Sequence, residues 1–150
     1  MQALLWHALD GAHKGSVQCD LCAHGCRLKK GDKGLCGVRA NSNGELVTLV
    51  GNVVTAVNMD PVEKKPLYHF LPGSRTFAIG SAGCNFFCKY CQNSSIAHIP
   101  PSGLVPGKRA TPEDLIVLAQ ENHARSMAFT YNEPTVFFEL VYETARLATA

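Results

Sequence analysis

The placement of the cysteines constrains this chain more than any other feature of its sequence. The seven cysteines form two groups, Cys19, Cys22, Cys26 and Cys36, and then Cys84, Cys88 and Cys91. Within each group most neighbours are separated by only two or three residues, which is a spacing typical of metal ligands. An odd number of cysteines without a secretion signal fits a disulfide framework poorly. The sequence therefore predicts two metal sites.

The composition excludes several classes of protein. Hydrophobic residues make up 46% of the chain and charged residues 17%, which is typical of a globular soluble protein. The net charge of +2 is too small to favour nucleic acid or a membrane surface. The apolar stretch at the N-terminus is too short for a signal peptide, and no apolar run approaches the ~20 residues of a membrane span. We therefore expect a cytoplasmic protein that binds neither nucleic acid nor a membrane.

The chain divides into two expected domains, residues 1–73 and residues 74–150. The first combines a loop-rich metal-binding segment with a β-hairpin. Two β-branched runs, residues 46–50 and residues 53–57, flank Gly51-Asn52, and this pattern predicts that they pair as the two strands of the hairpin.

The second domain has a repeated strand–helix pattern. Residues 76–80 and 126–131 read as buried strands, the proline- and glycine-rich residues 99–107 as a loop, and residues 135–150 as a helix. An earlier helix is expected to begin after Thr111, an N-cap residue followed by proline and two acids. This βαβα order predicts an α/β fold with parallel strands. Loops that follow parallel strands meet at one edge of the sheet, so the loops after residues 80 and 131 should be neighbours.

The second cysteine group provides three sulfur ligands on one loop. A structural zinc ion or an electron-transfer cluster generally takes four protein ligands. Three thiolates at Cys84, Cys88 and Cys91 would leave one iron of a [4Fe–4S] cluster open to another ligand. His98 is an alternative fourth ligand, although a lone histidine in a loop is more often exposed to solvent.

This loop, with Tyr90 directly before its last cysteine, resembles the signature of the radical S-adenosylmethionine (SAM) superfamily. The resemblance implies that SAM binds the open iron, and that one electron from the cluster releases a 5′-deoxyadenosyl radical. Residues 130–134 (Thr-Tyr-Asn-Glu-Pro) resemble the superfamily motif that holds the SAM amino group. Tyr90, Asn132 and Glu133 are therefore candidate SAM-binding residues. The alternative for Glu133 is a local role in turning a strand into a helix.

The first cysteine group could close a tetrahedral metal site by itself. Cys19, Cys22, Cys26 and Cys36 provide four thiolates, and the spacing permits either zinc or a second iron–sulfur cluster. A zinc module that binds nucleic acid is disfavoured, because the nearby basic residues are not interleaved with aromatic residues.

The longer pattern of both cysteine groups, residues 63–70 and residues 130–134 resembles the radical SAM enzyme of the AmmeMemoRadiSam system, which is similar to pyruvate formate-lyase activating enzymes. The resemblance implies an oxidoreductase, the first part of a partial TIM-type barrel, a reductant such as flavodoxin or ferredoxin, and a protein substrate that receives a glycyl radical. A full barrel needs about 250 residues, so we expect about two βα units of it here. The alternatives are a ferredoxin-like electron-transfer protein and a zinc-binding interaction module.

Overall fold

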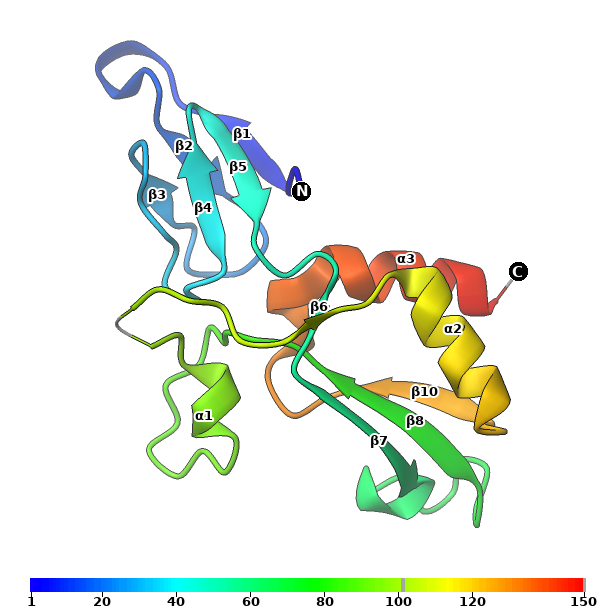
Figure 1. Ribbon diagram of the computed structural model, residues 1–150. Helices are drawn as coiled ribbons and strands as arrows, with labels where there is room; N and C mark the ends of the chain where they lie inside the picture. Colours follow the sequence, from blue (N-terminus) through cyan, green and yellow to red (C-terminus); the bar gives the residue numbers. More distant parts are fainter. Residues whose placement is uncertain (101, 150) are drawn as a thin grey trace.

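The computed structural model describes residues 1–100 and 102–149. Figure 1 shows short N-terminal strands, coloured blue to cyan, beside a longer sheet that two helices cover. A loop that carries the short helix α1 (Ser94–Ala97) extends below the N-terminal strands. Among the described residues, no helix is long and apolar enough to cross a membrane.

The N-terminal region consists of two small antiparallel sheets and one 3-10 helix. The first sheet has the order β1-β2-β3 and the second has the order β4-β5. Their bounds are β1 (Trp6–Ala8), η1 (Gly11–His13), β2 (Val17–Cys19), β3 (Arg27–Leu28), β4 (Arg39–Ser42) and β5 (Glu45–Thr48). A small core of Ala3, Val17, Cys19, Leu28 and Leu46 packs between them.

The hairpin predicted from residues 46–50 and 53–57 is wrong. β5 pairs instead with β4, the strand that precedes it. The connecting residues Asn43 and Gly44 have φ angles of +56° and +91°. A two-residue hairpin turn of type I′ requires positive φ at both positions, and an Asn-Gly pair adopts such angles readily. The second predicted strand forms β6 (Val53–Val54) and part of β7 (Ala56–Pro61), which pair elsewhere.

The longer sheet has the order β10-β8-β7. β8 (Arg75–Gly80) and β10 (Ser126–Phe129) are parallel, as predicted, and β7 runs antiparallel to β8. β6 pairs separately with β9 (Lys108–Arg109). Since β7 joins this sheet, residues before position 73 take part in the fold of the expected second domain. The division at residue 73 stays a prediction.

Two helices cover one face of this sheet. α2 (Pro112–Glu121) begins with the predicted cap: Thr111 and Asp114 exchange hydrogen bonds between side chain and backbone. The expected helix over residues 135–150 is a 3-10 turn, η3 (Pro134–Phe137), followed by α3 (Phe138–Ala148), and Ala150 lies outside the described residues, as does Pro101 of the expected loop.

The main core lies between the two helices and the sheet. It includes Phe77 and Ile79 of β8, Leu115 of α2 and Leu140 of α3, all nearly inaccessible to solvent. Because side chains alternate along a strand, the intervening residues of β8 face the opposite side of the sheet. The helices of the βα units therefore cover one face of the sheet, and in the described part of the chain the opposite face is lined only by loops and short turns.

Candidate functional site

The loop that carries Cys84, Cys88 and Cys91 begins directly after β8, at the carboxyl end of the strand. Its root, residues 81–84, is buried. Gly83 has a φ angle of +82°, and a Cβ atom there would lie 2.6 Å from the carbonyl oxygen of Cys36. The backbone of the four-cysteine region therefore packs directly against the root of the loop, which no residue with a side chain would permit.

The three sulfur ligands of this loop differ in exposure. Cys84 is buried, Cys91 is half-buried and Cys88 is exposed. The backbone N–H of Phe86 donates to the sulfur of Cys84 over 3.4 Å. The side chain of Tyr90 is 89% exposed. This loop is thus fixed at Cys84 and open to solvent at its tip.

His98, the alternative fourth ligand, lies at the end of this segment. Its ring stacks on the ring of Phe87, with the centroids 6.0 Å apart and the planes within 12°.

Asn132 connects the loop after β10 to the root of the cysteine loop. Its amide nitrogen donates to the carbonyl oxygen of Gly83 over 2.6 Å, and its Oδ1 accepts from the N–H of Ser81 over 3.1 Å. Asn93, just beyond Cys91, donates to the carbonyl oxygen of Tyr131 over 2.8 Å. The two loops are therefore neighbours, as the parallel strand order predicts.

The Glu133 side chain has a local role in this structure. Its Oε1 accepts from the backbone N–H of Thr135 over 3.2 Å and from the Thr135 hydroxyl over 2.6 Å, which caps η3. Within the described chain Oε2 accepts no hydrogen bond. Binding of SAM by Glu133, Asn132 and Tyr90 stays a prediction.

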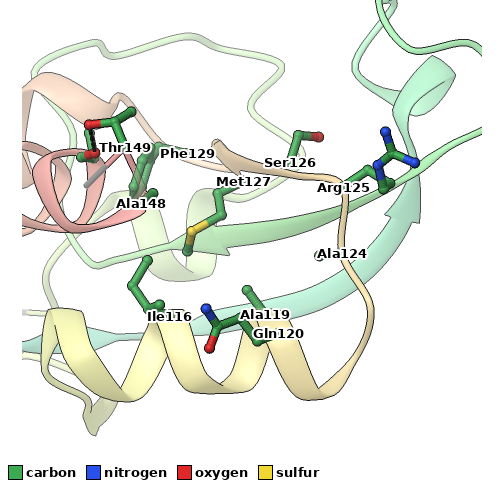
Figure 2. A pocket seen from close by; sticks show the side chains of 11 residues that line it. Ile116, Ala119, Gln120, Ala124, Arg125, Ser126, Met127, Phe129, Ala148 and Thr149 are labelled. Carbon is green, nitrogen blue, oxygen red and sulfur yellow. Dashed lines mark hydrogen bonds between the residues drawn. The ribbon is translucent and has the colours of Figure 1, made fainter.

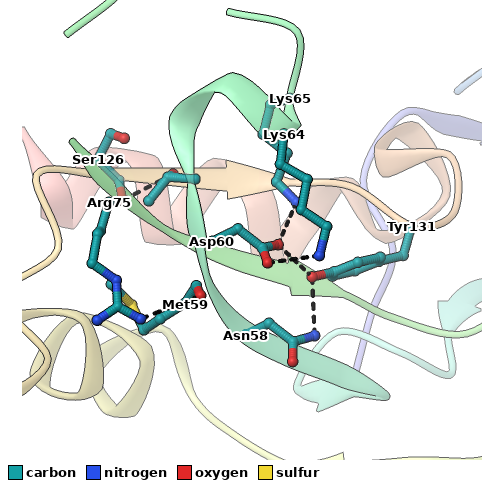
Figure 3. Close-up of polar contacts among 9 residues, drawn as sticks. Asn58, Met59, Asp60, Lys64, Lys65, Arg75, Ser126 and Tyr131 are labelled. Atoms are coloured by element: carbon teal, nitrogen blue, oxygen red, sulfur yellow. Dashed lines mark hydrogen bonds and ion pairs between the residues drawn. The ribbon is translucent and has the colours of Figure 1, made fainter. Parts of the chain in front are cut away.

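The face of the sheet away from the helices carries a cluster of polar residues that the sequence analysis did not predict. Figure 3 shows Asp60 accepting from Lys64 over 2.9 Å, from Lys65 over 2.7 Å and from the Tyr131 hydroxyl over 3.1 Å. The hydrogen bonds from Lys64 and Lys65, followed by that from Tyr131, lower the pKa of Asp60 from 3.8 to about 2. Asn58 of β7 also donates to the Tyr131 hydroxyl, over 3.0 Å.

Tyr131 takes a left-handed backbone conformation, with a φ angle of +73°. Such angles are uncommon for an aromatic residue and persist only where the surroundings enforce them. Here the ring is held by its hydroxyl bonds to Asp60 and Asn58 and by the ammonium of Lys65, 4.9 Å from the ring centroid. The Glu-Lys-Lys run at residues 63–65 was visible in the sequence, but nothing local links it to a tyrosine more than sixty residues later.

The four cysteines of the N-terminal region line one small cavity of about 20 Å³. Burial raises the pKa of the Cys19 thiol, and it raises that of the Cys36 thiol as well. These two groups therefore favour the protonated thiol unless a bound cation displaces the proton.

The donor chemistry of the three-cysteine loop fits a [4Fe–4S] cluster. Its ligands are all sulfur, and Cys84 already accepts a backbone hydrogen bond of the kind that stabilises a thiolate. As positioned, however, no three His, Cys, Asp or Glu side chains among residues 1–100 and 102–149 form a group that could hold a metal ion. Ligation at either cysteine group therefore requires its side chains to rotate inward.

Two larger hollows lie away from the cysteine sulfurs, along β10. An apolar cavity of about 330 Å³ lies between α2, α3 and the start of β10, where Figure 2 shows Ile116, Met127 and Phe129 around it. A more polar groove of about 710 Å³ follows β10 on the face of Lys65 and Tyr131. The outer edge of β10 has no strand partner in the described part of the chain.

Comparison with known proteins supports the superfamily that the loop resembles. Residues 79–150 match the family model of the Radical SAM superfamily, a match that begins within β8 and includes both loops of the site. The chain is also 36% identical over 147 residues to an uncharacterised protein of Methanocaldococcus jannaschii. That alignment covers 98% of this chain and 43% of the relative, so the chain spans less than half the length of the protein it matches. No solved structure matches the chain.

Proposed function

We propose that this chain is part of a radical SAM enzyme in which Cys84, Cys88 and Cys91 bind a [4Fe–4S] cluster. The observation that carries the proposal is the contact between the two loops. The Asn132 side chain holds the loop after β10 against the carbonyl oxygen of Gly83, at the root of the cysteine loop. This contact brings the candidate cluster ligands and the candidate SAM-binding residues to one edge of the sheet.

The cluster, when bound and reduced, supplies the electron that cleaves SAM into methionine and a 5′-deoxyadenosyl radical, which abstracts hydrogen from the substrate. The residues of this chain hold and orient the reacting groups. Cys84 is fixed on the buried side of the loop, where the Phe86 N–H donates to its sulfur. Cys88 and Cys91 lie nearer the solvent, so the side of the loop opposite Cys84 is the side from which SAM would approach.

We propose that the Glu133 carboxylate binds the amino group of SAM. Thr135 fixes the orientation of this carboxylate through Oε1 and leaves Oε2 without a partner among the described residues. An ammonium group there would make a charge-assisted hydrogen bond. Both amide atoms of Asn132 are hydrogen-bonded to the cysteine loop. Its contribution to SAM binding is therefore to position Glu133. Tyr90, at the exposed tip, is available for a stacking contact.

The rest of the proposed protein follows from the resemblance. We propose that further strands extend the sheet from the unpaired edge of β10 toward a partial TIM-type barrel, and the greater length of the relative supports this. The likeness to pyruvate formate-lyase activating enzymes extends the proposal to an oxidoreductase with a flavodoxin or ferredoxin as reductant. Its substrate would be a protein partner that receives a glycyl radical. A cytoplasmic location stays a prediction.

The proposal is tested by electron paramagnetic resonance (EPR) on the full-length protein. The protein is reconstituted anaerobically with iron and sulfide, reduced, and measured with and without SAM. We expect a reduced-cluster signal whose g-values shift on addition of SAM, because SAM becomes a ligand of the open iron. A cluster signal that SAM leaves unchanged would contradict the proposal and favour an electron-transfer protein.

Two variants separate the roles of the residues. Cys88→Ser should abolish the SAM-sensitive signal, whereas Lys89→Ser, at the exposed neighbouring position of the same loop, should retain it. Glu133→Gln should keep the cluster but weaken SAM binding about tenfold or more, because one charge-assisted hydrogen bond is replaced by a neutral one.

A further inference from the structure

The cavity lined by Cys19, Cys22, Cys26 and Cys36 lies outside the proposed active site. Its sulfur ligands come from two tight turns of the N-terminal region. In the first, the N–H of Cys19 donates to the carbonyl oxygen of Cys26 over 2.9 Å. In the second, the N–H of Gly37 donates to the carbonyl oxygen of Gly34 over 2.8 Å, which closes a turn around Cys36. The two turns face each other across the cavity.

Gly34 leaves the space between the sulfur atoms clear. A Cβ atom at this position would lie 3.7 Å from the sulfur of Cys26 and 3.8 Å from the sulfur of Cys36. Both sulfur atoms therefore lie within 4 Å of the same point. A larger side chain at residue 34 would stand beside both sulfur atoms, in the place where they approach each other.

Arg39 provides a second, independent indication of a ligand in this cavity. Its side chain is only 2% exposed, its terminal nitrogens bond to Glu139 and to the carbonyl oxygen of Leu4, and it lines the cavity. Its Nε is buried without a hydrogen-bond partner in the described chain. Buried N–H groups are nearly always paired, and a metal-bound thiolate in this cavity would provide an acceptor for this one.

Asn85 contributes a further unsatisfied atom. It lines the same cavity, and its Oδ1 is also buried without a partner among the described residues. Rotation of the amide group by half a turn would put its N–H₂ group, a donor, in the place of this oxygen. Arg39 and Asn85 account for two of the three buried side-chain polar atoms that have no partner in the described part of the chain. The unsatisfied polar atoms thus concentrate where four cysteines converge.

The number of thiols and the small size of the cavity favour a single ion over a cluster. Between the side chains as they stand, the centre of a water-sized sphere has only about 20 Å³ of room, which is enough for a single ion. Four thiolates that rotate inward complete the tetrahedral shell of one zinc ion, whereas a four-iron cluster with its inorganic sulfides would require the surrounding segments to move apart. Four thiolates around a divalent ion carry a net charge of −2, and the buried Nε–H of Arg39 beside the cavity is a hydrogen-bond donor available to that charge.

We propose that Cys19, Cys22, Cys26 and Cys36 bind a single tetrahedral zinc ion, and that this centre braces the root of the Cys84 loop. His24, between the zinc ligands, donates through Nε2 to the carbonyl oxygen of Asn85 over 2.9 Å. The carbonyl of Cys36 packs on Gly83 from the same side. The zinc centre is independent of the proposed function, while the importance of bracing the loop rests on it.

The metal itself is tested by elemental analysis and zinc X-ray absorption of the full-length protein. We expect one zinc per chain with four sulfur neighbours at about 2.3 Å. Cys36→Ser should lose the zinc, and Cys88→Ser, the matched control, should keep it. The triple variant Cys84→Ser, Cys88→Ser, Cys91→Ser should contain zinc and no iron. Four irons per chain in that triple variant would overturn the zinc proposal, and so would the absence of any metal.

The bracing is tested by amide hydrogen exchange on the Cys88→Ser protein, with zinc bound and after its removal by a chelator. Exchange at residues 83–87 should become at least tenfold faster without zinc, while exchange in α2 should stay unchanged. Equal rates at residues 83–87 would overturn the bracing. A protein that holds zinc but shows no SAM-sensitive EPR signal would refute the proposed function and leave the zinc centre intact.

Discussion

The two cysteine groups carry the same ligand atoms in opposite surroundings. The four-cysteine group surrounds a cavity of about 20 Å³, with Arg39 buried beside it. The three-cysteine loop has a buried first ligand, an exposed second ligand and an almost fully exposed Tyr90. This is the difference we expect if the four-cysteine group binds a metal with protein ligands alone and the three-cysteine loop leaves one position for another ligand.

The largest loss of stability is expected on breaking the ion pair that joins the four-cysteine region to α3. Arg39 donates to both carboxylate oxygens of Glu139 on α3, over 2.9 and 3.2 Å, and the pair is almost fully buried. Glu139→Ala would leave the Arg39 charge buried and unpaired. We expect a loss of about 3–5 kcal/mol in the free energy of unfolding, measured by urea denaturation.

An exposed ion pair provides the control for this variant. Glu143 and Arg146 pair on the surface of α3 over 3.0 Å. Glu143→Ala should change the free energy of unfolding by less than about 1 kcal/mol, because solvent screens this pair. Equal effects of the two variants would mean that the closed surroundings of Arg39 contribute nothing to stability.

The next largest loss of stability is expected for Asn132, which holds the root of the three-cysteine loop. Asn132→Leu should remove both hydrogen bonds to the loop root and leave the N–H of Ser81 and the carbonyl of Gly83 buried without partners. We expect a loss of about 1–3 kcal/mol in the free energy of unfolding and faster amide exchange at residues 83–91.

The matched amide control is Asn122→Ala, which removes an exposed bond to the carbonyl oxygen of Leu118. It should change neither quantity measurably. If Asn132→Leu behaved in the same way, the contact between the two loops would not position the cysteine loop.

A smaller, pH-dependent effect is expected at Asp60. Its pKa is about 2 in the folded protein, below the ordinary value of 3.8, because two lysines and Tyr131 donate to it. The stabilisation is therefore complete above about pH 4 and is lost as the pH falls toward 2. With allowance for the exposed Lys64, we expect it to amount to about 1–2 kcal/mol.

This effect is measured by comparing the pH dependence of thermal unfolding in the wild type and in Asp60→Asn. The difference between the two melting temperatures should shrink as the pH decreases from 4 to 2. Parallel curves would show that the carboxylate is not held in its charged form by these contacts.

The smallest effect is expected at the start of α2, far from either cysteine group. Thr111→Ala removes the hydrogen bond from the Asp114 N–H to the Thr111 hydroxyl and should lower the free energy of unfolding by about 1 kcal/mol. It should change neither the zinc content nor amide exchange at residues 83–91. A loss of zinc in this variant would mean that general destabilisation, rather than local contacts, controls metal binding.

Local patterns in the sequence determined several elements correctly. The cap at Thr111, the strand that leads into Cys84 and the parallel pairing of β8 with β10 follow from residue types and spacing within short windows. The clustering of the cysteines likewise divides them into two groups, and the first group lines one cavity in the fold; metal binding at either group stays a prediction. The Asn43-Gly44 turn was also readable, since that pair is a strong hairpin signal, but the longer β-branched runs beside it drew the prediction to the wrong partner.

The tertiary structure alone decided which distant groups meet. Arg39 pairs with Glu139 a hundred residues away, Asp60 with Tyr131, and Asn132 with Gly83. Each of these contacts depends on how the sheets and helices pack, and packing is a sum over the whole chain that no short window contains. For the same reason the sequence provided the four thiols of the first group, and only the fold showed that they line one small cavity.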